Sequence, residues 1–201
     1  MDRTFLSRLF NLPIAPSFIL YVLVLLICYS AGIEPEMVLR DLMQTCEQPI
    51  GVGLISNLGI LLWGAAASIS LFVSFSGLTP NSGWRNFLLL GGLFSTLLCL
   101  DDFFLLHDSY QISQDILYIT YISLALFFLY KYTRYIYISG KIQFLTSVLF
   151  LGLSLLADIF QHFLPINYQD VQLFEEGFKF IGVSCWLAFW SQASFYAISD
   201  K

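Results

Sequence analysis

The sequence predicts an all-α integral membrane protein, a single domain (residues 1–201) built as a bundle of six transmembrane helices. Hydrophobic residues make up 58% of the chain and charged residues 11%, and the mean hydropathy is +0.76. A soluble domain carries about 25% charged and about 45–50% apolar residues. This composition excludes a soluble enzyme, a disordered chain and a nucleic-acid-binding protein, because each of these needs more charge.

Six apolar stretches have the length of a membrane-crossing helix, which needs about 20 mostly apolar residues. They cover approximately residues 17–33, 52–75, 84–107, 112–132, 143–164 and 172–198. All six prolines fall at the ends of these stretches or between them, where a missing backbone donor is tolerated. No clear cleavage site follows the first stretch, so we expect it to be retained as a span and not removed as a signal peptide.

The distribution of charge orients the predicted bundle. Short loops rich in Lys and Arg remain on the cytoplasmic side of a membrane. Placing both termini inside gathers most basic residues in the inner segments and most acids outside; these basic residues are Arg3, Arg8, Arg85, Lys131, Arg134, Lys141 and Lys201. We therefore predict an N-in, C-in, multi-pass protein of the plasma membrane or another energy-transducing membrane.

The first outer loop, residues 34–51, has a helical pattern of its own. Pro35 suits the first turn of a helix. Val38, Leu39 and Leu42 recur at a spacing of three to four residues. This pattern predicts a short amphipathic helix at the outer membrane interface. A simple cap on the loop is the favoured interpretation, and a lid over a site is the alternative.

Ionisable residues are concentrated at the outer ends of three predicted spans. A carboxylate inside a span costs about 2.5–3.5 kcal/mol, so such residues usually face the interior of a bundle or a cavity. Antiparallel neighbours bring these helix ends to one depth, where we expect a polar site. The residues are Asp101, Asp102, His107 and Asp108 in the third span, Asp158 and His162 in the fifth, and Glu175, Glu176 and Lys179 in the sixth.

Helical geometry sorts the residues of the third span into faces. Asp101 and Asp108 are seven residues apart and lie nearly in line along the helix. Asp102 points about 100° away from Asp101, and His107 points to yet another face, so both join a site less easily than Asp101 and Asp108 do.

Spacing on the other two spans suggests specific pairs. Asp158 and His162 are four residues apart and share a helix face. Glu175 and Lys179 have the spacing of a salt bridge, for which Glu176 can compete.

Asp, Glu and His are ligands suited to Zn, Fe or Mn, and facing helices of a bundle can assemble such a site. The metal hypothesis assigns Asp101, Asp158, His162 and Glu175 as ligands, with Glu176 or Asp108 as the acid/base. Because the site lies in the outer leaflet, the substrate is expected to be lipid-like. The resulting prediction is a metal-dependent membrane enzyme.

Other interpretations remain open at this point. Asp108 and His107 are near enough to the aqueous edge to be interface residues, and acids at a helix start complement its dipole. The polar cluster can also be a structural network. Two further functions are a noncatalytic subunit or assembly factor of a larger membrane complex, and a proton or cation transporter or channel.

Overall fold

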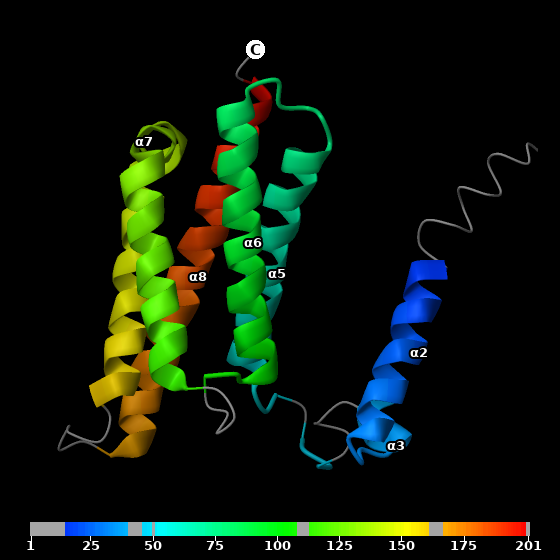
Figure 1. Cartoon of the computed structure of the whole chain (residues 1–201). Helices are drawn as coiled ribbons and strands as arrows, with labels where there is room; N and C mark the ends of the chain where they lie inside the picture. Colours follow the sequence, from blue (N-terminus) through cyan, green and yellow to red (C-terminus); the bar gives the residue numbers. More distant parts are fainter. Residues whose placement is uncertain (1–14, 40–45, 50, 108–112, 161–166, 200–201) are drawn as a thin grey trace, which may run out of the picture. The chain divides into compact units, whose positions relative to one another are not determined.

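The computed structural model describes residues 15–39, 46–49, 51–107, 113–160 and 167–199 (Figure 1). Every regular element within these ranges is a helix, which confirms the predicted all-α class. The chain divides into two compact units, Met1–Val52 and Gly53–Lys201.

The first unit contains α2 (Ala15–Ser30) and α3 (Pro35–Leu39). α2 ends three residues before the predicted position 33, and Gly32 follows it with a left-handed φ of 80°. Apolar side chains such as Phe18 and Ile27 are exposed along α2. α3 begins at Pro35, where the sequence predicts a loop helix, and residues 40–45 of that predicted helix lie outside the described residues.

The second unit contains α5 (Leu54–Phe75), α6 (Ser82–Phe104), α7 (Gln114–Phe160) and α8 (Tyr168–Ser199). The side chain of Asn81 caps the start of α6 by accepting a hydrogen bond of 2.8 Å from the Gly83 amide. α6 ends three residues before the predicted position 107, because Leu105 turns the chain with a left-handed φ of 50°.

α7 corresponds to two predicted spans joined by a bend. Its backbone leaves helical geometry at Tyr132 and at Gly140, where φ is 143°. Figure 1 shows the two resulting arms, residues 114–131 and 141–160, running antiparallel. The predicted loop between these spans is therefore a helical bend, and a glycine supplies the conformation that L side chains rarely adopt.

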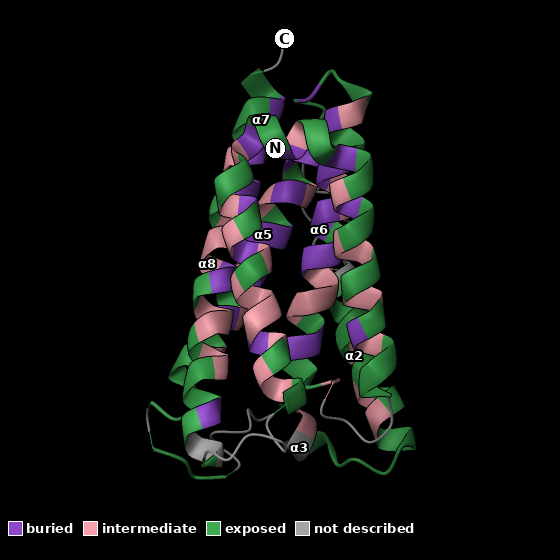
Figure 2. Ribbon diagram, turned by 90° about the vertical axis from the view of Figure 1, so that its left-hand side faces the viewer, coloured by how far each residue is buried: buried purple, intermediate pink, exposed green. Residues whose placement is uncertain are grey.

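Aromatic side chains fill the core of the second unit. α5 packs along α6 and α8, α7 packs along α8, and α6 approaches α7 only sparsely. Buried positions recur along these helices (Figure 2). Gly91 lies so close to Trp190 that a Cβ there would be 1.9 Å from the indole ring. A Cβ at Gly92 would likewise be 2.6 Å from the Leu71 side chain, so both glycines allow close helix contact.

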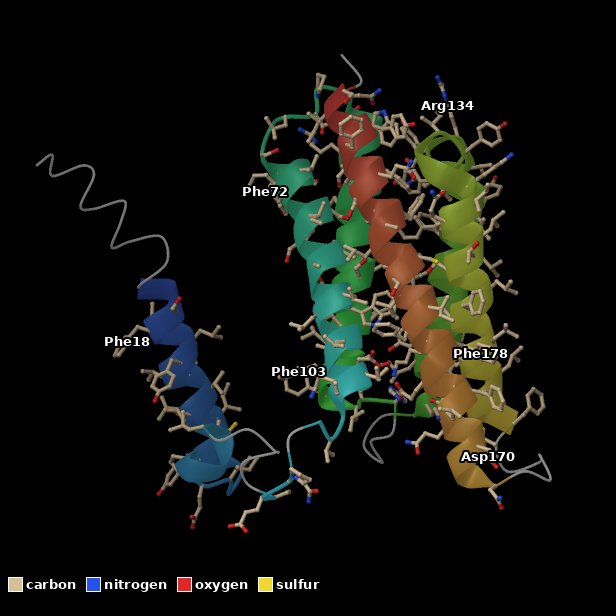
Figure 3. The ribbon with its side chains drawn as sticks, turned by 180° about the vertical axis from the view of Figure 1, so that it is seen from behind. Phe18, Phe72, Phe103, Arg134, Asp170 and Phe178 are labelled. Atoms are coloured by element: carbon tan, nitrogen blue, oxygen red, sulfur yellow. The ribbon has the colours of Figure 1, made fainter. Side chains whose placement is uncertain are left out.

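The two ends of the second unit carry side chains of opposite charge. The bend of α7 carries Arg134, and Asp170 lies at the opposite end, in the first turn of α8 (Figure 3). Apolar side chains such as Phe72 and Phe103 project outward between these ends. A large apolar exterior is typical of a surface that contacts lipid.

Three described helices, α5, α6 and α7, are long and apolar enough to cross a membrane. This is fewer than the six predicted spans. The described part of α2 is 16 residues long, shorter than the usual span. α8 carries Asp170, Glu175, Glu176 and Lys179 in its first half, and the two arms of α7 belong to one element that bends between Tyr132 and Gly140.

Candidate functional site

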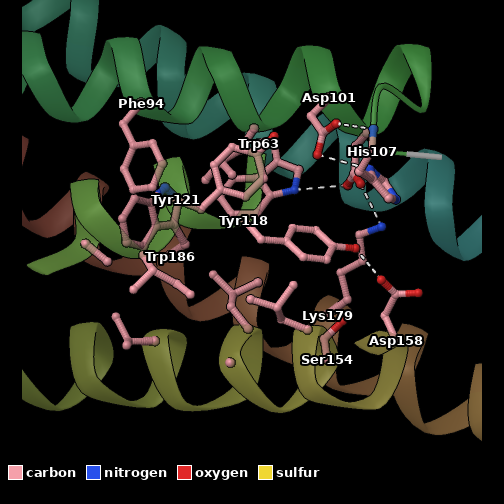
Figure 4. Close-up of a pocket in the computed structure, with 18 of the residues that line it drawn as sticks. Trp63, Phe94, Asp101, His107, Tyr118, Tyr121, Ser154, Asp158, Lys179 and Trp186 are labelled. Atoms are coloured by element: carbon pink, nitrogen blue, oxygen red, sulfur yellow. Dashed lines mark hydrogen bonds and ion pairs between the residues drawn. The ribbon is translucent and has the colours of Figure 1, made fainter. Parts of the chain in front are cut away.

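A cavity of about 220 Å³ lies within the second unit, at the end where α6 stops and α8 begins. α5, α6, both arms of α7 and α8 supply its walls. Figure 4 shows Phe94 and Trp186 at one end, and ionisable side chains toward the other. The cavity is therefore amphipathic; its ionisable lining residues include Asp101, Asp102, His107, Asp158, Glu175 and Lys179.

Asp101 holds the turn that follows α6. The backbone amide of His107 donates to one carboxylate oxygen at 2.9 Å, and Nδ1 of the same histidine lies 3.0 Å from the other oxygen. The backbone carbonyl of Asp101 also accepts from the amide of Leu106 at 3.1 Å. The expectation that His107 points away from Asp101 is wrong, because it assumed a helix that continues to residue 107.

Asp102 is the centre of a second polar group. Its carboxylate forms an ion pair of 2.6 Å with the Lys179 ammonium and accepts a hydrogen bond of 3.1 Å from the Trp63 indole. Only 7% of Asp102 is exposed, so its charge depends on these partners. Lys179 lies 3.8 Å from Glu176. The ion pair of this lysine with Asp102 of α6 is thus shorter than its contact with Glu176 of its own helix.

Asp158 belongs to a third polar group, on the two arms of α7. The Tyr118 hydroxyl donates to the Asp158 carboxylate, and the Gln114 amide donates to the same carboxylate oxygen at 3.0 Å. The Gln114 amide also contacts the tyrosine hydroxyl, at 2.7 Å. These contacts join the start of α7 to its end, which closes the hairpin at the cavity.

The predicted site residues have different outcomes. Asp101, Asp158 and Glu175 all line the cavity. Glu176 is not part of the lining, but it lies 3.8 Å from Lys179, which is. Asp108 and His162 lie outside the described residues.

The metal hypothesis finds no support among the residues that the structure describes. In those residues, no group of three or more His, Cys, Asp or Glu side chains is placed to hold a metal ion. Asp101 faces His107, and Asp158 accepts hydrogen bonds from Tyr118 and Gln114. These two carboxylates thus accept from different protein donors and do not converge on a common metal position.

Sequence reasoning missed several members of the site. Trp63 lies in the middle of an apolar stretch, and nothing in its neighbourhood marks it as the partner of a carboxylate 39 residues away. Gln114 and Tyr118 carry a weak signal, since they are four residues apart on the first turns of a span and share a face.

The family model described as "Domain of unknown function (DUF8692)" matches residues 17–193. The match runs from α2 into α8, so all the residues that line the cavity fall within it. No curated protein and no solved structure matches the chain. Because the family model covers most of its length, this protein belongs to the DUF8692 family, a domain of unknown function.

Proposed function

We propose that this chain crosses the membrane six times, through α2, α5, α6, the two arms of α7, and α8, with both termini in the cytoplasm. Two observations support this topology. The arms of α7 run antiparallel, as two successive spans must. The bend between them carries Arg134 and the opposite end carries Asp170, and basic segments remain inside.

The free thiol of Cys46 tests the topology, because the proposed arrangement places this exposed residue outside. In a variant that retains only Cys46, a membrane-impermeant maleimide is expected to label intact cells. In a cysteine-free variant with Ser199→Cys, label is expected only after permeabilisation. The reverse pattern at the two positions contradicts the topology.

We propose that the amphipathic cavity binds a lipid-like molecule. The observation that carries this proposal is its lining, which joins an ionisable end to an apolar end made by Phe94, Leu98 and Trp186. Ile122 also lines the cavity and is 49% exposed on the outer surface of α7. A chain bound inside can therefore continue into the surrounding lipid beside this residue.

The charges of the cavity favour one class of head group. Four carboxylates line it against a single ammonium, which leaves it net negative. Trp63, Tyr118 and Tyr121 add aromatic rings to the same lining, and such rings attract cations. A head group that carries an amine, or several hydroxyl donors, fits this lining better than a phosphate or a sulfate.

The Asp101–His107 pair supports acid–base chemistry on that head group. Asp101 orients His107 by contacting both the imidazole Nδ1 and the backbone amide of that histidine. When Nδ1 carries the proton directed at the carboxylate, Nε2 is the basic nitrogen. A histidine held in this way can take a proton from a hydroxyl or from water. The proposed function is a membrane enzyme that acts on a lipid-like amine or polyol.

Binding of chemically matched amphiphiles tests the cavity. In purified protein in nanodiscs, dodecylamine is expected to bind more tightly than dodecanol, and dodecyl sulfate not to compete. Asp158→Asn is expected to weaken amine binding about tenfold, since a hydrogen bond to a charged group contributes about 1.5–3 kcal/mol. Asp170→Asn is the control, because Asp170 is an exposed acid at the same end and does not line the cavity.

Turnover separates an enzyme from a binding subunit. The protein is incubated with total membrane lipid extract, and products are followed by mass spectrometry. His107→Gln is expected to retain dodecylamine binding and to lose the product. Binding without any product in the unchanged protein would favour the noncatalytic subunit, and preferred binding of dodecyl sulfate would contradict the site itself.

A further inference from the structure

A second cavity, of about 320 Å³, lies at the basic end of the second unit, away from the amphipathic cavity. It is formed by the start of α6, the bend of α7 and the end of α8. We propose that this cavity binds the phosphate group of an anionic membrane lipid. This proposal uses different residues from the amphiphile site and does not depend on its function.

The polar lining of this second cavity offers hydrogen-bond donors and one positive charge. Arg134 contributes a planar guanidinium, whose paired N–H groups match the geometry of phosphate oxygens. Tyr135, Tyr196 and Ser199 contribute hydroxyls. Among the described residues, no carboxylate lines this cavity or forms an ion pair with Arg134. An anion therefore meets no repulsion from these walls.

Local structure fixes two donors of this lining, Asn81 and Tyr135. The Oδ1 atom of Asn81 accepts from the Gly83 amide, which leaves its Nδ2 group as a donor. The Tyr135 ring packs 4.7 Å from the Trp84 ring and stacks at 5.5 Å on Phe87. Its hydroxyl group lies directly over Gly83, where a Cβ would be 1.9 Å from the oxygen. The same turn is the start of α6, whose dipole favours an anion.

The surroundings indicate a lipid as the source of the phosphate. Trp84 and Ile138 add apolar surface to the lining, and Ile138 is also exposed on the outside of the bend. An apolar tail attached to the phosphate can therefore leave along the lipid-facing surface. Basic pockets between transmembrane helices at the cytoplasmic side bind lipid head groups in this way, and the proposed topology places this end in the cytoplasmic leaflet.

Melting of the purified chain in nanodiscs tests this inference. Phosphatidylglycerol is expected to raise the melting temperature relative to phosphatidylcholine, and native mass spectrometry is expected to show retained phosphatidylglycerol. Arg134→Gln is expected to weaken that retention about tenfold, as loss of a charge-assisted bidentate contact does. Tyr196→Phe, which removes one donor from the same lining, is expected to weaken it less.

Lys141→Gln is the matched control. This lysine belongs to the same basic bend but lies 4.6 Å over the Tyr137 ring and does not line the cavity. The Lys141→Gln variant is expected to retain phosphatidylglycerol as the unchanged protein does. If Lys141→Gln and Arg134→Gln lose phosphatidylglycerol equally, the retention depends on nonspecific surface charge and the proposal is overturned. Equal stabilisation by inorganic phosphate in phosphatidylcholine nanodiscs would overturn the assignment to a lipid.

Discussion

Replacing Lys179 with Met is expected to destabilise the protein by about 3–5 kcal/mol, because it leaves the Asp102 carboxylate buried without its cation. The Trp63 indole remains as a donor, but a single neutral hydrogen bond does not balance a buried charge. Unfolding of the detergent-solubilised protein, followed by tryptophan fluorescence or far-ultraviolet circular dichroism, measures this change.

The double variant Lys179→Met/Asp102→Asn provides the decisive comparison. Removing both charges is expected to recover most of the lost stability, since the neutral amide can still accept from Trp63. Lys141→Met, at the exposed bend, is expected to change stability by less than about 0.5 kcal/mol. If the double variant is as unstable as Lys179→Met alone, the ion pair is not the cause of the effect.

Replacing Gly91 with Ala is expected to destabilise the core by about 1–3 kcal/mol through overpacking. The new methyl group would lie 1.9 Å from the ring of Trp190, whose side chain is fully buried among Phe87, Phe128 and Phe189. The ring therefore has no free space to move into, and the helices must separate. A lower melting temperature in detergent measures the effect.

Gly59→Ala is the matched control for this substitution. Gly59 is also a buried helical glycine, but a Cβ there has no atom within 4 Å. The change is expected to leave stability unchanged or to raise it by up to about 1 kcal/mol, because alanine is the better helix former. If both variants destabilise equally, close contact at Gly91 is not the reason for its effect.

Hydropathy was enough to predict where the helices lie. The ends of α5 and α8 fall within a few residues of the predicted stretches, and the bend of α7 lies where the fourth predicted stretch ends and before the fifth begins. The apolar character of a residue is a local property, so it can be read from the chain alone. The number of spans is less well determined, because it depends on how short or polar a crossing helix can be.

The pairing of side chains was not predictable in the same way. Helical periodicity places Lys179 on the face of Glu175, but does not say that Asp102 of α6 lies opposite. Likewise, one left-handed residue, Leu105, decides that His107 returns to Asp101. Such contacts depend on tertiary packing and on the residue at which a helix stops, and apolar periodicity reports neither of these.

The Asp101 carboxylate is bound twice by His107. One carboxylate holds both the imidazole and the backbone amide of the same residue. A ligand that draws this carboxylate toward its own head group must therefore loosen the turn after α6 as well. Solvent exchange of a single amide proton, that of His107, thereby becomes an intrinsic reporter of whether the cavity is occupied.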